Sequence, residues 1–66
     1  MVSYNPLWKL LIDKNMKKLD LCAEVGMSRA TLAKMGKNEY VALAVLDKIC
    51  CTLHCKIEDI IEIKEE

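Results

Sequence analysis

The sequence predicts an all-α domain of five helices, and two kinds of observation support that fold class. Apolar side chains recur at spacings of three and four residues through most of the chain, which is the repeat of helices with one buried face. Residues that start or stop helices, among them Pro6, Gly26 and Ser28, stand at the ends of these apolar stripes. Sixty-six residues are enough for one small core, so we expect a single domain over residues 1–66.

The first predicted helix begins at Asn5, with that residue as N-cap and Pro6 in the first helical position. It ends at residues 13–15. Its apolar stripe contains Leu7, Leu10 and Leu11. We interpret Trp8 as an anchor at the edge of the core in preference to a platform on which bases stack.

Residues 18–37 have the pattern of two short helices joined by a tight turn. Gly26 stands where the first of these helices must stop, because glycine takes the left-handed conformation at little cost. Ser28 precedes the second helix, and its hydroxyl can accept a hydrogen bond from a free backbone N–H there. Helix, glycine turn and capped helix together predict a helix-turn-helix.

The rest of the chain predicts a loop and two further helices. The loop spans residues 36–41, and a fourth helix follows over residues 42–54. The core-facing stripe of that helix contains Leu43, Leu46, Ile49, Cys50 and Leu53. Residues 57–61 predict a short fifth helix, and the alternation over residues 61–64 also fits an extended segment whose free edge could pair with a second copy.

The predicted helix-turn-helix resembles that of the Cro-like and lambda-repressor-like regulators. The residues that carry the resemblance are Leu21, Cys22, Val25, Gly26, Met27, Leu32 and Met35. The rest of the chain resembles small stand-alone members from Gram-positive bacteria and their mobile elements, so the similarity extends over nearly the whole chain. The chain departs from the pattern of these regulators at two positions. Cys22 stands where they more commonly have alanine, and Ala42 stands where Ser or Thr usually caps the fourth helix. The resemblance implies a transcriptional regulator that binds duplex DNA in a sequence-specific manner.

The helix that starts at Ser28 is expected to enter the major groove. Arg29 and Ala33 are four residues apart, as are Ala30 and Lys34, so these side chains form one exposed strip. We expect Arg29 and Lys34 to contact bases, with Ala30 lining the interface. The alternative is an ordinary solvated face with two charges.

Other polar residues are expected to hold phosphates. The lysines at the start of the second helix, Lys17 and Lys18, can meet a phosphate together with the positive helix end. Ser28 is assigned the same role. The resemblance adds Lys37 and Asn38 from the loop, and Tyr40 less strongly. Without the resemblance, two exposed lysines near a turn would carry no functional meaning.

The formal net charge is zero, but the charges are unevenly distributed. Residues 14–37 contain six cations and two anions, a net charge of +4, whereas residues 57–66 contain one cation and five anions, a net charge of −4. A dipolar domain of this kind can present a basic face to phosphates. Two ordinary solvated surfaces would give the same counts.

The sequence gives no support for catalysis, a cofactor or a metal. It has no phosphate-cradling glycine loop, and His54 has no evident partner as a nucleophile or base. Cys51, His54 and Cys55 would have to bind zinc if the protein were a metal or thiol sensor, but their spacing differs from that of common structural zinc sites. No apolar run is long enough to span a membrane and no signal peptide is evident, so we expect a cytoplasmic protein.

The expected partners are double-stranded DNA and a second copy of the chain. Helix-turn-helix proteins bind two half-sites about 34–36 Å apart as two-fold dimers, so we predict a homodimer at least on DNA. No small-molecule effector is evident. The alternative function is an antitoxin-like or anti-repressor-like protein-interaction module, which the zero net charge and acidic end favour somewhat.

Overall fold

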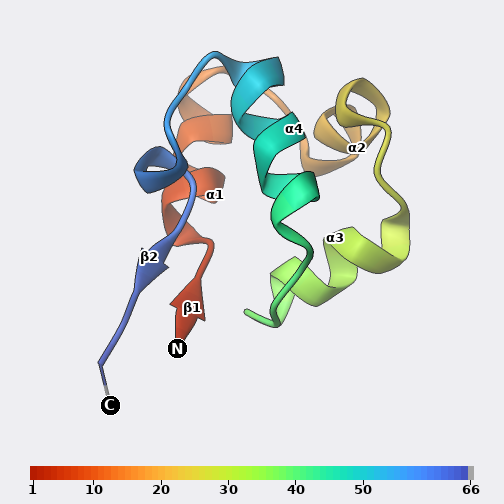
Figure 1. The fold of residues 1–66 in the computed structure, drawn as a ribbon. Coiled ribbons are helices and arrows are strands. Elements are labelled where there is room, and N and C mark those ends of the chain that lie inside the picture. Colours follow the sequence, from red (N-terminus) through yellow and green to blue (C-terminus); the bar gives the residue numbers. More distant parts are fainter. Residues whose placement is uncertain (66) are drawn as a thin grey trace.

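The computed structural model describes residues 1–65, and helices make up most of it (Figure 1). The elements in chain order are β1 (Val2–Ser3), α1 (Asn5–Asp13), α2 (Lys18–Val25), α3 (Arg29–Gly36), α4 (Leu43–Leu53), the 3-10 helix η1 (Ile57–Asp59) and β2 (Glu62–Ile63). The predicted helical fold class is confirmed, but the count of five helices is not. The segment expected as a fifth α-helix forms one 3-10 turn, and residues 1–65 contain four α-helices.

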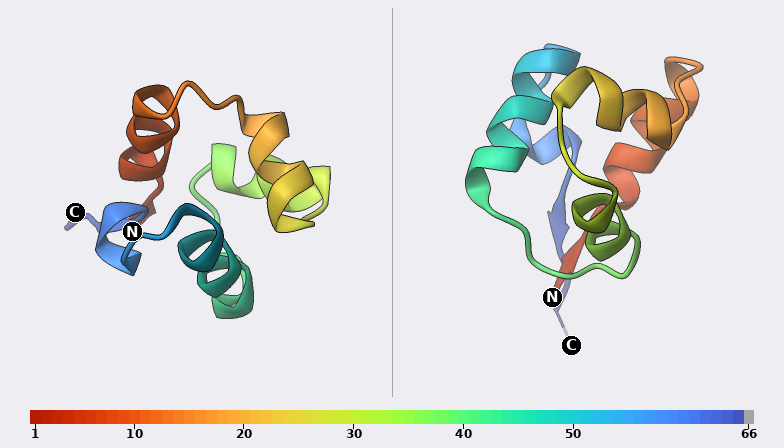
Figure 2. Two further views of the ribbon diagram at one scale, coloured as in Figure 1. Left: turned by 90° about the horizontal axis from the view of Figure 1, so that it is seen from above. Right: turned by 90° about the vertical axis from the view of Figure 1, so that its right-hand side faces the viewer.

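The core lies where the helices meet around α4. Helix α4 packs against α2 and against η1, while η1 also packs against α1. Figure 2 shows α4 between α1 and η1 on one side and α2 and α3 on the other. The side chains with no exposed surface come from five different elements or their ends, namely Leu7, Leu21, Met35, Ile49 and Ile60. Their burial holds the short helices together, because each is too short to be stable alone.

The start of α1 differs from the sequence prediction. Asn5 is the first helical residue and not the N-cap, which is Tyr4. No side chain caps this helix end; instead the Asn5 backbone N–H donates to Ser3 Oγ at 3.3 Å. Tyr4 is only 1% exposed, so the residue before the helix is fixed by its burial.

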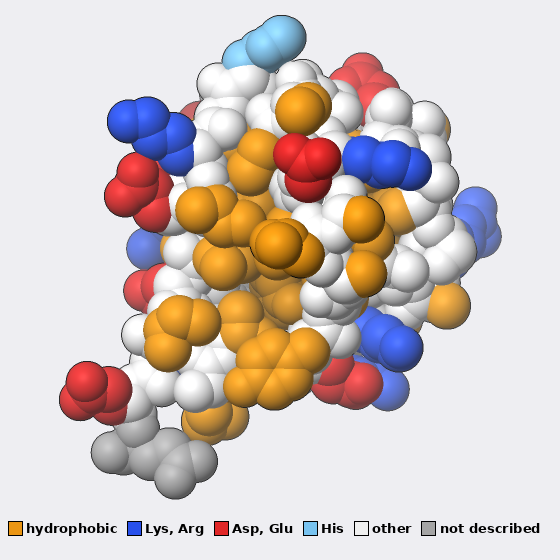
Figure 3. Space-filling model, in the orientation of Figure 1, with side chains coloured by type: hydrophobic (Ala, Val, Ile, Leu, Met, Phe, Trp, Pro, Cys, Tyr) orange, Lys and Arg blue, Asp and Glu red, His pale blue; other side chains and the backbone are white. Residues whose placement is uncertain are grey.

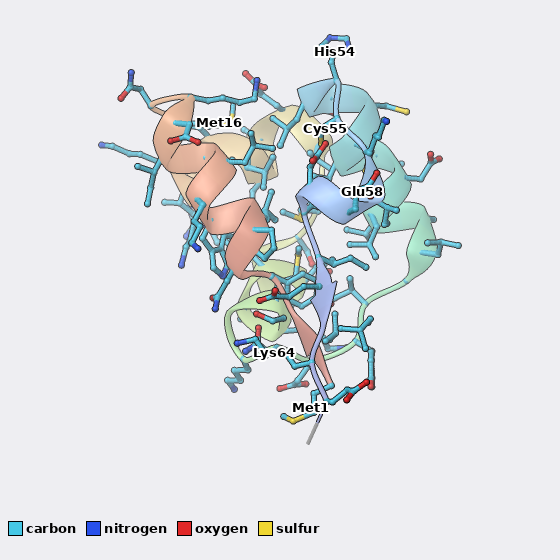
Figure 4. The ribbon with its side chains drawn as sticks, turned by 90° about the vertical axis from the view of Figure 1, so that its left-hand side faces the viewer. Met1, Met16, His54, Cys55, Glu58 and Lys64 are labelled. Atoms are coloured by element: carbon cyan, nitrogen blue, oxygen red, sulfur yellow. The ribbon has the colours of Figure 1, made fainter. Side chains whose placement is uncertain are left out.

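The two ends of the described chain pair as a short antiparallel sheet. Val2 lies opposite Ile63 and Ser3 opposite Glu62. Next to them, the Lys64 N–H donates to the Met1 carbonyl at 2.7 Å, and the N-terminal ammonium donates to the Lys64 carbonyl at 2.9 Å (Figure 4). The extended segment near residues 61–64 is therefore confirmed, and one of its edges is occupied by the same chain.

Helix α4 ends in a left-handed cap at His54, which has a φ of 54°. The next N–H, that of Cys55, donates to the Cys50 carbonyl at 3.0 Å and closes the helix end. Figure 4 shows His54 projecting away from the body of the molecule. At the other end of α4, Leu43 is 72% exposed, so its placement in the core-facing stripe was wrong. The longest helix within residues 1–65 is α4 itself, and none there is both long and apolar enough to cross a membrane.

Candidate nucleic-acid interface

Gly26 forms the turn between α2 and α3. It has a φ of 79°, and its N–H donates to the Cys22 carbonyl at 2.8 Å. The Met27 N–H donates to the same carbonyl at 3.2 Å. The chain reverses here because the left-handed residue ends α2 at once. The helix-turn-helix predicted from the glycine position is present.

Ser28 caps α3, as the sequence predicted. Its Oγ accepts a hydrogen bond from the Thr31 N–H at 3.1 Å and lies 3.0 Å from Thr31 Oγ1. The cap satisfies one of the N–H groups that have no partner within the helix. The hydroxyl therefore has a structural role whether or not DNA is present.

The outward side of α3 carries the predicted strip. Met35 has no exposed surface, and Leu32 and Thr31 are half-buried, which fixes how the helix is rotated. The strip itself is exposed and comprises Arg29, Ala30, Ala33 and Lys34. The ion pair within residues 1–65 joins Lys64 to Glu62, so neither Arg29 nor Lys34 forms an ion pair with a carboxylate of those residues. A polyanion can therefore approach the strip without breaking an ion pair within residues 1–65.

The start of α2 holds its two lysines differently. The Lys17 N–H donates to Asp20 Oδ2 at 3.0 Å, so the Asp20 carboxylate caps the helix. The Lys18 ammonium lies 4.3 Å from the centroid of the Trp8 ring, which is within cation–π range. Trp8 is half-buried and packs against the core, in agreement with its predicted role as an anchor at the core edge. The sequence did not reveal the contact with Lys18, because it joins two different helices.

The loop after α3 is tied to the N-terminal segment. Asn38 has a φ of 58° and is exposed, as is Lys37. The Tyr4 N–H donates to Asn38 Oδ1 at 3.2 Å, and the Tyr4 hydroxyl donates to the Glu39 carbonyl at 2.7 Å. Burial raises the pKa of Tyr4 above its ordinary value near 10. Sequence reasoning missed Tyr4; the only local signal was an aromatic residue just before a helix start.

The candidate residues lie on the helix-turn-helix side of the molecule. Figure 2 shows α2 and α3 together on the side turned toward the viewer in its right panel. Ser28, Arg29, Ala30 and Lys34 belong to α3 or its cap, and Lys37 ends that helix. The lysines Lys17 and Lys18 are the N-cap and first residue of α2.

The four cysteines differ in their surroundings. Among residues 1–65, no three His, Cys, Asp or Glu side chains cluster in a way that could hold a metal ion. Cys22 is buried, whereas Cys51 is exposed and its thiol lies 3.9 Å from Asp47 Oδ1. Burial, reinforced by the neighbouring Cys50, raises the pKa of the Cys55 thiol.

Comparisons with known proteins match this geometry. A family model described as the Cro/C1-type helix-turn-helix DNA-binding domain matches residues 6–66. A crystal structure of the transcriptional regulator VanUg is similar to this chain, with 58% sequence identity and a TM-score of 0.95. That similarity covers 98% of this chain and 87% of the VanUg chain. Among curated proteins, none matches the chain.

Proposed function

Since this chain belongs to the family of Cro/C1-type helix-turn-helix DNA-binding domains, we propose that it is a transcriptional regulator that reads a specific duplex sequence. The observation that carries the proposal is the exposed strip on α3, with two cations that no carboxylate of residues 1–65 neutralises. Its similarity to a transcriptional regulator at 58% identity supports the same role.

Helix α3 reads the bases from the major groove. The groove is about 12 Å wide and admits a helix. Small side chains at Ala30 and Ala33 let the α3 backbone approach the base edges, and a methyl there can contact a thymine methyl. Arg29 and Lys34 flank them and donate to guanine O6 and N7.

Residues at the ends of α2 and α3 hold the DNA backbone. Lys17 and Lys37 supply exposed ammonium groups at the start of α2 and the end of α3. Lys18 approaches from its position over Trp8, and Ser28 and Asn38 complete the phosphate contacts. These contacts set affinity and register, whereas the strip sets sequence preference.

The regulator acts as a homodimer at least on DNA, and an apolar face supplies the contact. This face contains Leu43 and Ile57, which line one groove and are 72% and 41% exposed. Tyr40 and Ile63 are further apolar side chains, with 77% and 71% of their surface exposed. Figure 3 shows hydrophobic side chains gathered on the side of the molecule that faces the viewer in Figure 1. The partner we propose for this face is a second copy of the chain, because a two-fold dimer can contact two half-sites on the DNA. Leu43 and Ile57 line one groove, which would receive side chains of that second copy.

The test of DNA reading is selection from a random duplex library, followed by titration of the selected duplex at two salt concentrations. We expect a palindromic or repeated site, with affinity that falls steeply as salt rises. Arg29→Ala and Lys34→Ala should each weaken binding about fivefold to 100-fold and relax preference at their positions. Lys48→Ala, on the exposed side of α4, is the matched control and should leave sequence preference unchanged. Unchanged preference in both strip variants would overturn the assignment of α3.

The homodimer is tested by the mass of the protein with and without the duplex. Leu43→Glu should reduce the dimer fraction, whereas Ile12→Glu, at a position of similar exposure on α1, should not. A monomeric mass on saturating duplex would refute the dimer. A chain that binds no duplex in a salt-dependent way would instead be a protein-interaction module.

A further inference from the structure

Tyr4 joins the N-terminal segment to the loop that follows α3. Its backbone N–H donates to the side-chain oxygen of Asn38, and its hydroxyl donates to the carbonyl of Glu39. These partners lie 34 and 35 residues further along the chain. Tyr4 is 1% exposed, so both bonds start from a residue that the core holds in place. A buried residue with two bonds to one exposed loop restrains that loop.

The bond to Asn38 also fixes which end of its amide faces outward. A backbone N–H can only donate, so the amide atom that faces Tyr4 is the oxygen. The NH₂ group occupies the other side of the same planar amide and points away from the Tyr4 N–H. Asn38 is exposed and has a left-handed φ of 58°, which Asn tolerates better than most residues.

This orientation suits a phosphate. Phosphate oxygens only accept hydrogen bonds, and an amide that presented its oxygen outward would repel them. We propose that Tyr4 is a positioning residue of the DNA interface, holding the loop of Lys37, Asn38 and Glu39 so that the Asn38 NH₂ group faces a phosphate. The inference rests on the proposed function, because it requires that the loop meets a DNA backbone.

Tyr4→Phe is the first variant, because it removes the bond to Glu39 and keeps the buried ring. We expect the affinity for the selected duplex to fall about three- to tenfold, as for the loss of one restrained contact. Because the same loop carries Lys37, the slope of log affinity against log salt should also become shallower, by up to about 0.9, the value for one phosphate neutralised by a cation. A purely structural role would lower the unfolding midpoint without changing this slope.

Ser3→Ala is the matched control. Ser3 is 2% exposed and lies next to Tyr4, and its hydroxyl accepts a local bond from the Asn5 N–H. Like Tyr4→Phe, this substitution removes one hydroxyl from the N-terminal segment, but it leaves the hydrogen bonds from Tyr4 to Asn38 and Glu39 in place. We expect reduced thermal stability with unchanged affinity and salt slope for the duplex.

Asn38→Asp and Asn38→Gly test whether the outward NH₂ group of Asn38 matters for DNA binding, or only the hydrogen bond that its side-chain oxygen accepts from Tyr4. Asp keeps an acceptor for the Tyr4 N–H but replaces the outward donor with a charged oxygen, whereas Gly keeps the left-handed backbone and removes both groups. Both should bind the duplex more weakly, Asp by about tenfold or more. Full affinity in the Asp variant would overturn the proposed orientation of the amide.

A double variant tests whether Tyr4 acts through the loop. If it does, Tyr4→Phe combined with Lys37→Ala should weaken binding less than the product of the two single effects. If the wild-type chain binds the duplex and Tyr4→Phe changes neither affinity nor slope, the inference fails and the proposed function stands. If the wild-type chain shows no salt-dependent binding to any selected duplex, the proposed function fails and the inference fails with it.

Discussion

The substitution Gly26→Ala isolates the backbone cost of the turn between α2 and α3. A Cβ added at Gly26 meets no atom within 4 Å, so packing contributes nothing to the change. The cost is conformational, because φ is +79° and a residue with a Cβ loses about 1–2 kcal/mol in the left-handed region. The lower entropy of the unfolded alanine chain offsets about 0.4–1 kcal/mol of this. We therefore expect a net loss of about 1 kcal/mol in the free energy of unfolding.

Gly36→Ala is the matched control with the opposite expected sign. Gly36 is the last residue of α3, its added Cβ also meets nothing within 4 Å, and its φ lies outside the left-handed region. Alanine there should raise the free energy of unfolding by about 0.5–1 kcal/mol. The two variants differ in backbone conformation and not in packing, so their difference measures the turn alone.

Thermal unfolding followed by far-UV circular dichroism without DNA is sufficient to measure both variants. A change of 1 kcal/mol shifts the midpoint of a domain of this size by about 4–8 °C. Gly26→Ala should therefore melt several degrees below the wild-type chain and Gly36→Ala several degrees above it. Equal shifts of the same sign would show that the left-handed turn is not what Gly26 supplies, and the reasoning would be refuted.

Three further changes test other local features of the fold. Ser28→Ala should lower the free energy of unfolding by about 0.5–2 kcal/mol through loss of the α3 cap, whereas Ser28→Gly should lower it by only a few tenths of a kcal/mol. Urea unfolding measures both changes, and equal losses would contradict a capping role. His54→Gly should stabilise the chain by about 1 kcal/mol, because His54 holds the left-handed cap of α4 with a φ of 54°; a lower midpoint in thermal unfolding would contradict this. Because burial raises the pKa of Tyr4, the unfolded chain releases that proton first, so stability should fall as the pH rises above about 10. Tyr4→Phe should make stability less dependent on pH in that range, and an unchanged dependence would assign the effect to other groups.

Most helix ends were predictable because their signals are local. Gly26 ends α2, Ser28 caps α3 and Pro6 stands at the start of α1, and each acts through atoms within one turn of the chain. The side of α3 that faces outward was predictable from helical spacing, because a helix that buries Met35 leaves Arg29 exposed. The exposed strip was therefore accessible from spacing alone.

The features that were missed depend on residues far apart in the sequence. The alternation over residues 61–64 indicated an extended segment, but nothing local identified Val2 as the partner of Ile63. The two hydrogen bonds of Tyr4 reach a loop 34 and 35 residues further along the chain. Leu43 fits the apolar repeat of α4 but lies at its first turn, where no element of residues 1–65 covers it. Periodicity gives the direction of a side chain but not the presence of a neighbour.

The residues proposed to meet DNA fall into two groups with different consequences for selection. Arg29 and Lys34 are exposed and form no ion pair within residues 1–65, so under the proposed function we expect substitutions there to change sequence preference without altering the fold. Ser28 and Asn38 also hold structural bonds, to the Thr31 and Tyr4 backbones, so substitution there changes affinity and stability together. It follows that a new operator is most accessible through the strip on α3, while the backbone contacts are constrained by the core. Under the proposed function, this division would let the chain keep one docking geometry while substitutions in the strip change the sequence it reads.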